Sequence, residues 1–459
     1  MSVARLLIAG VSSGVGKTTL TVGLIRALRR RGLRVAAFKC GPDYLDPTYH
    51  SLAAGQPSQN LDGWMMGKQA VLDTFGAATE DADIAIIEGV MGLFDGASPS
   101  SEEGSSAEIA KWLSAPVLLV ADASGMARSI AALARGFADF DPALRVAGIA
   151  ANRAGSAGHL ELLRAALAGQ PPLLGGLQKR PALAFRERHL GLRTADHRTV
   201  PEELLEQWAD EVANGLDLDA LIEIARSAPA LPPAPAPAAA RERRCRIGVA
   251  LDAAFHFYYA DNLRRLEQLG AELVSFSPIA ARELPDVDGL YFGGGYPELH
   301  ARELAENHAL RAAIRAFAEG GAPIYAECGG LMYLVDSIRT LDGTSHRMLG
   351  CLRGEAVLRE RRVALGYVEV ETLSPSLLGP AGQRFRGHQF RYSELIDAPP
   401  GDSYRLQRRR GSEPELEGYR AGNVLASYVH AHWASNPALA ANFVQACADA
   451  REHRSAQRG

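Results

Sequence analysis

The chain has 459 residues, 47% of them hydrophobic and 22% charged, which is ordinary for a globular protein but long for a single hydrophobic core. Its net charge of -4 gives no basic surface for nucleic acid or an acidic membrane, so neither is expected as a partner. The five cysteines include no CxxC pair, so neither a zinc site nor a disulfide framework is indicated.

The first residues predict a strand and no leader peptide. The apolar run at 6–9 is shorter than the core of a signal peptide and leads straight into a glycine-rich loop. No stretch approaches the roughly twenty apolar residues that a membrane-spanning helix needs. We therefore expect a cytoplasmic protein.

The glycine-rich segment GVSSGVGKTT at 10–19 lies between this strand and an expected helix. In that arrangement N–H groups and a helix N-terminus wrap phosphate oxygens, a lysine (Lys17) reaches the outer phosphates, and a hydroxyl (Thr18) ligates Mg²⁺. A standard loop has its first glycine where this chain has Val11, and Gly10 serves one residue earlier. This longer loop resembles the dethiobiotin-synthetase branch of P-loop proteins. The residues expected to bind ATP are Gly10, Gly14, Gly16, Lys17, Thr18 and Thr19.

Acidic residues follow two further strands of the first half, in the segments 41–47 and 88–96. Carboxylates at adjacent strand ends suit a Mg·ATP site that phosphorylates another carboxylate, which makes Asp43, Glu88 and Asp95 the candidates. The alternative is that they are turn and cap residues. Asn152, at the end of a later strand, is a candidate contact to the base or a strand-end cap.

Short β-rich runs alternate with amphipathic helical segments on both sides of an Ala/Pro-rich stretch at 228–244. This alternation predicts α/β units with parallel sheets and right-handed crossovers, and the proline density predicts a linker. From about residue 363 the pattern turns to strands and turns. The expected domains are 1–227 and 245–450, with a polar tail at 451–459. The expected strands are 5–9, 35–39, 84–88, 117–121, 146–152, 245–251, 272–276, 289–292 and 323–326.

A single cysteine in the second half carries the pattern of a nucleophile. The segment 324–334 reads as a strand, a sharp turn at Cys328 and a helix, and a helix N-terminus favours the thiolate. Gly294 and Gly295 follow another strand, where their N–H groups could form an oxyanion hole. For the base, the segment 427–432 ends a strand near the C-terminus and offers His430 and His432. The alternative for Cys328 is a buried inert thiol.

Two further histidines stand in distinctive surroundings. His388 lies in the segment 386–390 and is a weaker site candidate, for which structural or interdomain roles are favoured. His256 lies among aromatic residues and is expected to be a packing residue.

With both sites in place, the whole chain resembles the cobyrinic acid a,c-diamide synthases of cobalamin biosynthesis. The resemblance implies a P-loop synthetase domain of dethiobiotin-synthetase type, followed by a flavodoxin-like class I glutamine amidotransferase domain. The segments that carry it are 38–46, 88–96, 257–262, 293–299, 326–334 and 427–432.

The resemblance also implies the chemistry. Cys328, activated by His430, would release ammonia from L-glutamine through a thioester, while ATP phosphorylates an acetate side chain of a corrinoid and ammonia displaces the phosphate. Those amidotransferases carry a glutamate two positions after the histidine, where this chain has His432, so the chain has a dyad with His432 as a candidate third member. At the His388 segment the family favours glutamate and histidine where this chain has Gln389 and Arg391. A homodimer is left open.

The remaining roles are implied by position alone. Mg²⁺ would be held by Thr18, Asp43 and Glu88. The reacting carboxylate would meet Asp43, Tyr44, Leu45 and Asp95, with Tyr44 and Leu45 selecting which acetate reacts first.

Several related functions compete with this interpretation. The acceptor could instead be hydrogenobyrinic acid or a nickel sirohydrochlorin, and the cobyric acid synthase branch shares both domains but differs in its ligation motifs. A function of another class is a P-loop regulatory ATPase whose amidotransferase-like module is an inactive binding domain. The presence of both Cys328 and His430 argues against that alternative.

Overall fold

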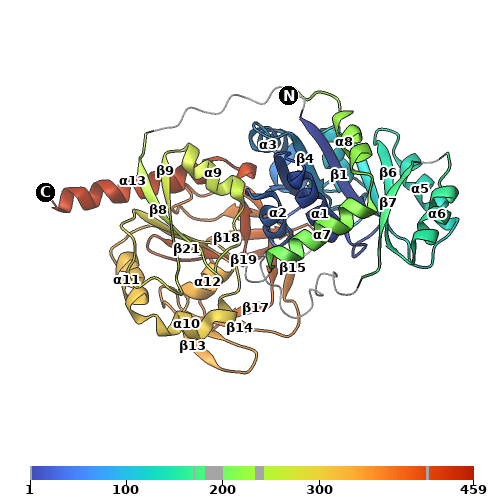
Figure 1. The fold of residues 1–459 in the computed structure, drawn as a ribbon. Coiled ribbons are helices and arrows are strands. Elements are labelled where there is room, and N and C mark those ends of the chain that lie inside the picture. Colours follow the sequence, from blue (N-terminus) through green and yellow to red (C-terminus); the bar gives the residue numbers. More distant parts are fainter. Residues whose placement is uncertain (1–2, 170, 181–199, 233–241, 410–412, 459) are drawn as a thin grey trace. The chain divides into compact units, whose positions relative to one another are not determined.

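The alternating apolar and amphipathic segments form strands and helices in the computed structural model, which describes residues 3–169, 171–180, 200–232, 242–409 and 413–458. The chain divides into two compact units, Met1–Pro237 and Ala238–Gly459, each of α/β class as predicted (Figure 1). The division falls within the stretch predicted as a linker, whose residues 233–241 lie outside the described ones. Among the described helices, none combines the length and the hydropathy needed to span a membrane.

The first unit contains a seven-stranded parallel sheet in the order β3-β2-β4-β1-β5-β6-β7. All five strands expected here are confirmed within two residues. β3 was not expected because three residues show no periodicity, and β7 was not expected because two central glycines lower its strand propensity. The strands are β1 (Ala4–Gly10), β2 (Val35–Cys40), β3 (Gln59–Leu61), β4 (Ile84–Glu88), β5 (Val117–Asp122), β6 (Val146–Ala154) and β7 (Leu173–Gln178).

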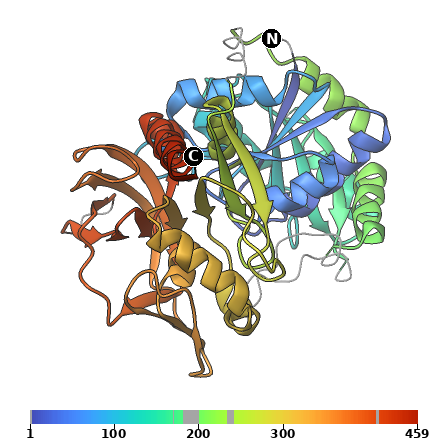
Figure 2. The same ribbon diagram turned by 90° about the vertical axis from the view of Figure 1, so that its left-hand side faces the viewer.

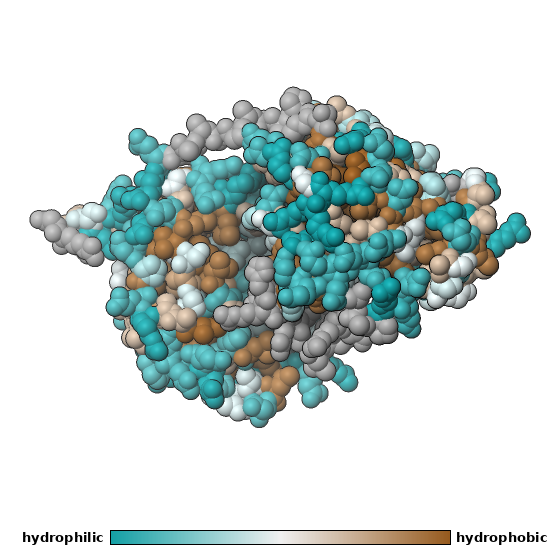
Figure 3. All heavy atoms as spheres, in the orientation of Figure 1, coloured by the Kyte–Doolittle hydropathy of each residue, from teal (hydrophilic) through white to brown (hydrophobic). Residues whose placement is uncertain are grey.

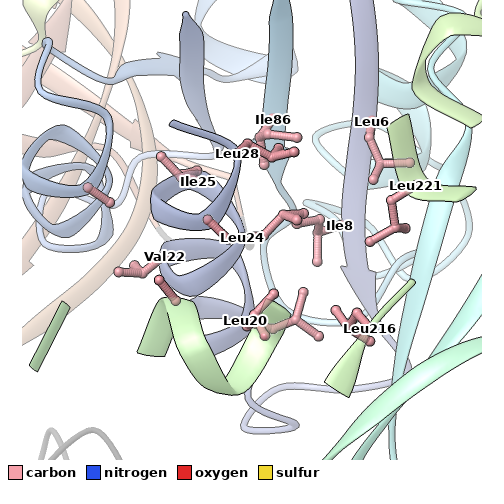
Figure 4. Close-up of a cluster of buried hydrophobic side chains, with 14 of the residues drawn as sticks. Leu6, Ile8, Leu20, Val22, Leu24, Ile25, Leu28, Ile86, Leu216 and Leu221 are labelled. Carbon is pink, nitrogen blue, oxygen red and sulfur yellow. The ribbon is translucent and has the colours of Figure 1, made fainter. Parts of the chain in front are cut away.

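Helices cover both faces of this sheet. Alternate residues of β1 point to opposite faces, and Leu6 and Ile8 point toward Leu24 of α1 and Leu221 of α8 (Figure 4). On the other face Phe75 of α3 packs on Phe38 of β2, with ring centroids 5.0 Å apart. The helices are α1 (Lys17–Arg30), α2 (Asp46–Ala54), α3 (Gly63–Ala78), α4 (Ser106–Trp112), α5 (Ser129–Phe140), α6 (Ala157–Ala166), α7 (Glu202–Gly215) and α8 (Leu218–Arg226).

The outer surface of α1 and α7 is hydrophilic (Figure 3). These two helices lie side by side, and Arg26 of α1 pairs with Glu202 and Glu206 of α7. The apolar side chains of both helices face the sheet instead, as expected for amphipathic helices that cover a buried strand layer.

The second unit is built on a six-stranded sheet in the order β20-β21-β11-β10-β8-β9. Its five parallel strands follow the 2-1-3-4-5 order of flavodoxin-like folds, in which ligands bind at the carboxyl ends of the strands. The four strands expected here are confirmed within one residue. The strands of this sheet are β8 (Cys245–Ala250), β9 (Ala271–Phe276), β10 (Gly289–Phe292), β11 (Ile324–Glu327), β20 (Tyr419–Ala421) and β21 (Val424–Ser427).

Two smaller sheets contain the strands predicted from about residue 363, and they also include strands between 337 and 358, earlier than predicted. One has the order β13-β12-β14-β17 and the other β19-β18-β15-β16-β22. Their strands are β12 (Ser337–Arg339), β13 (Ser345–Arg347), β14 (Glu355–Leu358), β15 (Ala364–Thr372), β16 (Arg384–Arg391), β17 (Ser393–Ile396), β18 (Tyr404–Arg408), β19 (Glu415–Glu417) and β22 (His430–His432). The helical segments are α9 (Ala260–Gln268), η2 (Pro297–His300), α10 (Ala301–Glu306), α11 (His308–Glu319), α12 (Gly329–Leu334), η3 (Trp433–Ser435) and α13 (Ala438–Arg458).

The C-terminal segment differs from the prediction of a polar tail at 451–459. Helix α13 continues to Arg458 and lies beside β8 and α9 (Figure 2). Arg451 donates to Arg244 O (3.0 Å), and Arg454 donates to Val287 O (2.7 Å) and pairs with Asp288. The polar residues of this segment therefore form part of a helix and not a loose tail, because their arginine side chains bind carbonyl and carboxylate oxygens.

Candidate functional site

The glycine loop after β1 is shaped by positions that only glycine fits. Gly14 and Gly16 have φ values of 78° and 92°, in the left-handed region. A Cβ on Gly16 would lie 2.0 Å from the Nδ2 atom of Asn152. That same Nδ2 donates to Val15 O (2.7 Å), so Asn152 supports the loop from β6. Its predicted contact to a nucleotide base stays a prediction.

Lys17 begins α1 and lies over the loop. Its Nζ atom donates to Ser12 O (3.2 Å) and to Met91 O (2.5 Å), which belongs to the turn after β4. The turn is itself joined to the loop, since Leu93 N donates to Gly10 O (2.9 Å). An ammonium group beside a helix N-terminus and exposed loop N–H groups suits the phosphates of a nucleotide.

Glu88, the last residue of β4, is the centre of a buried polar cluster. Thr18 Oγ1 donates to its Oε1 atom (2.8 Å), and Lys39 Nζ lies 2.9 Å from the same atom. His50 Nε2 lies 2.6 Å from Oε2, and Asp46 Oδ2 lies 2.6 Å from Lys39 Nζ. Thr18 and Glu88 therefore meet as predicted, while the parts of Lys39, His50 and Asp46 were not predicted.

This cluster stays charged despite its burial. Burial by itself raises the pKa of Glu88, but the Lys39 ammonium and the His50 hydrogen bond outweigh it and hold that pKa well below its usual range. Burial likewise lowers the pKa of Lys39, and the Asp46 and Glu88 carboxylates outweigh it and raise that pKa. A hydroxyl beside an ionised carboxylate is an oxygen donor set that fits Mg²⁺. Among the described residues no group of three or more His, Cys, Asp or Glu could hold a metal ion.

Asp43 caps the loop that precedes α2. Its Oδ1 atom accepts from the N–H groups of Leu45 (2.7 Å) and Asp46 (3.0 Å), and its carbonyl accepts from Asn60 Nδ2 (2.8 Å). The Asp43 carboxylate also contributes to the raised pKa of Lys39, so it lies close to the Glu88 cluster. Tyr44 and Leu45 are half-buried in the same loop. Their roles toward a metal or substrate stay predictions.

Asp95 is exposed and shapes the turn after β4. Its Oδ2 atom accepts from Gly92 N (2.9 Å), and its own N–H donates to Gly92 O (3.1 Å). The turn lies against the phosphate loop, since a Cβ on Gly92 would lie 3.3 Å from Val11 O. Asp95 thus has the turn-forming contacts of the alternative interpretation, in a position next to the nucleotide loop.

Cys328 stands at the sharp turn that the sequence predicts. Its φ of 48° and ψ of -101° place it outside the common regions, between β11 and α12. Its N–H donates to Ser427 O (2.7 Å), which ties the turn to the end of β21. The Sγ atom lies 4.0 Å from Phe390 O. A strained strand-to-helix turn that presents a side chain at the carboxyl end of a sheet is the geometry of a nucleophile.

The structure corrects the expectation that Gly294 donates to an oxyanion. Its N–H already donates to Phe257 O (3.2 Å), because residues 257 and 294 form a β-bridge. Gly295 lies instead against the sharp turn at Cys328, which we call the elbow, since a Cβ on Gly329 would lie 3.0 Å from Gly295 N. The N–H of Gly329 faces the Cys328 thiol and favours its thiolate, and the sequence analysis missed this donor.

His430 lies in the same region, on β22. A Cβ on Gly294 would lie 2.4 Å from the Cε1 atom of His430. The His430 ring therefore packs against the glycine turn at 293–295, which touches the elbow. Glu327, the residue before Cys328, accepts from Ala431 N (3.1 Å) and is paired in the sheet with Ser427. The glycine turn at 293–295 therefore lies against both the His430 ring and the turn at Cys328, and the pairing of Cys328 with His430 stays a prediction.

Burial keeps both reactive groups neutral. It raises the pKa of Cys328 to about 12, with a further contribution from Glu298 and an opposing one from Arg391. It lowers the pKa of His430 to about 3. The resting pair is thus a thiol and a neutral imidazole, which contrasts with the expected thiolate because desolvation exceeds the effect of a six-residue helix.

His432, the candidate third member of a triad, accepts from Ala434 N at its Nδ1 atom (3.3 Å). Burial lowers its pKa to about 4, although the Asp261 carboxylate opposes this. Its ring packs on Tyr259, with centroids 4.7 Å apart. His256 packs on Phe257 at 4.5 Å, in the aromatic surroundings that the sequence predicted.

Several functional candidates were missed because their chemistry depends on contacts and not on motifs. Lys39 and His50 carry no spacing signal, although Lys39 lies in β2, the strand that precedes the Asp43 loop. Asn262 holds β22 from both sides: its Nδ2 donates to Ala431 O (2.8 Å), and its Oδ1 accepts from Trp433 N (2.9 Å).

Comparisons with known proteins agree with this two-site geometry. Residues 246–438 match the family of CobB/CobQ-like glutamine amidotransferase domains, and residues 6–190 match the CobQ/CobB/MinD/ParA nucleotide binding domain. A cobyrinate a,c-diamide synthase of Leptospira interrogans (strain Fiocruz L1-130) is 51% identical over 97% of this chain and 99% of its own length. Proteins of the same name from Syntrophotalea carbinolica and Priestia megaterium are 52% and 41% identical, over 97% and 99% of this chain and 99% of their own lengths.

Proposed function

Because the chain belongs to the family of cobyrinate a,c-diamide synthases, we propose that its two sites perform the two halves of a glutamine-dependent amidation in cobalamin biosynthesis. The second unit releases ammonia from L-glutamine, and the first unit uses ATP to activate the a and c acetate side chains of cobyrinic acid. The fold and the family support a ligase. The residue roles below are supported by the geometry of the two sites.

In the second unit, Cys328 Sγ attacks the side-chain amide carbon of glutamine. His430 takes the thiol proton and returns it to the departing nitrogen, so ammonia leaves and a thioester forms, which water then cleaves to glutamate. Burial disfavours the charged forms of both groups, so we expect the proton transfer to accompany attack on the substrate carbonyl. We expect the N–H groups of Gly295 and Gly329 to stabilise the oxyanion, because Gly295 N lies against Gly329 and the Gly329 N–H faces the thiol.

In the first unit, the loop N–H groups and Lys17 bind the phosphates of ATP. The corrin carboxylate takes the γ-phosphoryl group, ammonia attacks the acyl carbon, and phosphate leaves. Thr18 and Glu88, with Asp43 nearby, would hold Mg²⁺, which neutralises phosphate charge when bound. Tyr44, Leu45 and Asp95 border this site and are proposed to meet the corrin.

One observation carries this proposal: the strained elbow at Cys328 stands beside a glycine turn and a buried histidine, in a chain that also has a nucleotide loop. The test supplies ATP, Mg²⁺ and either glutamine or ammonia to the wild type and to Cys328→Ala, with cobyrinate and hydrogenobyrinate as acceptors. We expect the variant to lose glutamine use and to keep ammonia use. Cys351→Ala, at a half-buried cysteine outside both sites, is the control and should keep both.

Two results would contradict the proposal. If Cys328→Ala loses ammonia use as well, the division of labour between the sites is wrong. If the wild type cleaves ATP at a rate that ignores glutamine and corrin, the chain is a regulatory ATPase and not a synthetase.

A further inference from the structure

The position where related amidotransferases carry a glutamate is occupied here by His432, so this side chain cannot supply a negative charge to His430. In a Cys-His-acid triad the carboxylate holds the imidazole in one orientation and tautomer. His432 is also engaged elsewhere, since its Nδ1 accepts from Ala434 N (3.3 Å). A different set of side chains must then fix the ring of His430.

His388 is directly opposite His430 in the antiparallel pair of β16 and β22. Cross-strand partners present their side chains on the same face of a sheet, and these two rings are stacked, with centroids 5.0 Å apart and planes inclined by 20°. Both residues are buried, with exposed fractions of 6% and 2%. A stacked ring in a packed interior opposes rotation of its neighbour about χ2, because the neighbour would have to sweep through occupied volume.

The His388 ring is itself fixed by Tyr259. The Tyr259 hydroxyl lies 2.9 Å from His388 Nδ1, and the phenol ring packs on His432 at 4.7 Å. Burial, together with the neighbouring histidines, lowers the pKa of His388 well below its usual value, so its ring is neutral. In the neutral tautomer that carries its proton on Nε2, the ring accepts a hydrogen bond from the phenol hydroxyl at Nδ1.

We propose that His388 and Tyr259 are positioning residues for the glutaminase reaction: Tyr259 fixes His388, and the stacked His388 ring fixes His430 toward the thiol. They replace the orienting part of a triad carboxylate through shape and one hydrogen bond, without charge. This inference rests on the proposed function and deepens its glutaminase half.

The test measures kcat and KM for glutamine, and separately the ammonia-dependent rate, in the full chain. His388→Ala should lower the glutamine kcat by about tenfold or more, since a misplaced catalytic group costs that much, while KM changes by less than about twofold. His388→Phe keeps a stacked ring, so its glutamine kcat should fall less than that of His388→Ala. Tyr259→Phe should lower the glutamine kcat by about threefold. Tyr404→Phe, at a buried tyrosine of β18, is the matched control and should change neither rate.

A double variant separates an indirect role from two independent ones. If Tyr259 acts through His388, Tyr259→Phe combined with His388→Ala should be no slower than His388→Ala alone. The proposal would be overturned if the kcat losses of the two single variants multiplied in the double variant. It would also be overturned by an unchanged glutamine kcat in His388→Ala, or by an equal loss of the ammonia-dependent rate. A wild type that does not use glutamine at all would instead overturn the proposed function.

Discussion

The phosphate loop shows how one residue can depend on a partner far away in the sequence. Gly16 is required twice, because its φ of 92° disfavours any side chain and because Asn152 fills the space that a Cβ would take. Gly14 shares the first property, with a φ of 78°, but has open space around its Cβ position. The two glycines therefore differ in packing and not in backbone conformation.

This difference predicts unequal costs for two similar substitutions. Gly14→Ala pays only for backbone strain, on the order of 1 kcal/mol of unfolding free energy, whereas Gly16→Ala adds a clash with Asn152 and should cost about 1–2 kcal/mol more. Urea unfolding of the full chain measures both. Adding Asn152→Ala to Gly16→Ala should restore part of the stability, and equal losses in the two glycine variants would contradict the packing argument.

The buried ion pair of Lys39 and Glu88 leads to a second prediction, about the free energy of unfolding. Both side chains are buried, at 4% and 0% exposure, so Lys39→Met leaves the carboxylates of Glu88 and Asp46 without their cation. We expect a loss of about 3 kcal/mol in unfolding free energy. Lys39→Met with Glu88→Gln should recover some of it. Lys111→Met, at a partly exposed ion pair, is the control and should cost less than about 1 kcal/mol; a similar cost for both lysines would show that burial does not govern the effect.

At the scale of elements, α13 illustrates how composition can mislead. The segment from residue 451 is polar, and a polar end of a chain is usually loose. Here its arginines reach carbonyl and carboxylate oxygens at the amino ends of two strands, so helix formation brings specific hydrogen bonds. The helix therefore belongs to the fold of the second unit.

Arg454→Ala tests that role. It removes the hydrogen bond to Val287 O and the ion pair with Asp288, whose side chain is only 7% exposed, and should lower the unfolding free energy by about 1 kcal/mol. Glu452→Ala, on an exposed face of the same helix, should have little effect. Identical unfolding curves for Arg454→Ala and the wild type would restore the interpretation of a tail.

At the scale of the whole molecule, the second unit buries several titratable groups, so its stability should depend on pH. Burial raises the pKa of Glu327 to about 8, and of Glu298 and Glu417 to about 7. A carboxyl group with a raised folded pKa stabilises the fold at low pH and loses that contribution as pH rises through the folded value. Buried His430 and His432 have lowered pKa values, so they change stability only below about pH 6.5.

Between pH 6.5 and 8.5 the unfolding free energy should therefore fall, and Glu327→Gln should flatten the decline. The reason is that the folded Glu327 keeps its proton up to about pH 8, while the unfolded one has lost it above 4.5. The difference in slope should reach about 1 kcal/mol per pH unit. Urea unfolding across this range measures it, with exposed Glu452→Gln as the control. Parallel pH curves for Glu327→Gln and the wild type would show that Glu327 is ionised in the folded chain.

The two α/β units, nine strands, the phosphate loop and the sharp turn at Cys328 could all be predicted from the sequence. These features follow from local patterns: apolar runs that alternate with amphipathic helices, glycines before a lysine, and a cysteine between a strand and a helix. The sequence also indicated Thr18 with Glu88, because strand ends of parallel sheets collect at one edge, whereas His430 was chosen as the partner of Cys328 by the family resemblance.

Which groups touch could not be predicted, because it follows from the packing of distant segments. The structure shows that Gly294 already uses its N–H, that Lys39 and His50 contact Glu88, that α13 is a packed helix, and that His388 is stacked on His430. No pattern along the chain contains this information, because hydrogen bonds, burial and the resulting pKa values depend on neighbours from distant strands. Motifs place a residue at the edge of a sheet, but packing determines its charge and its partners.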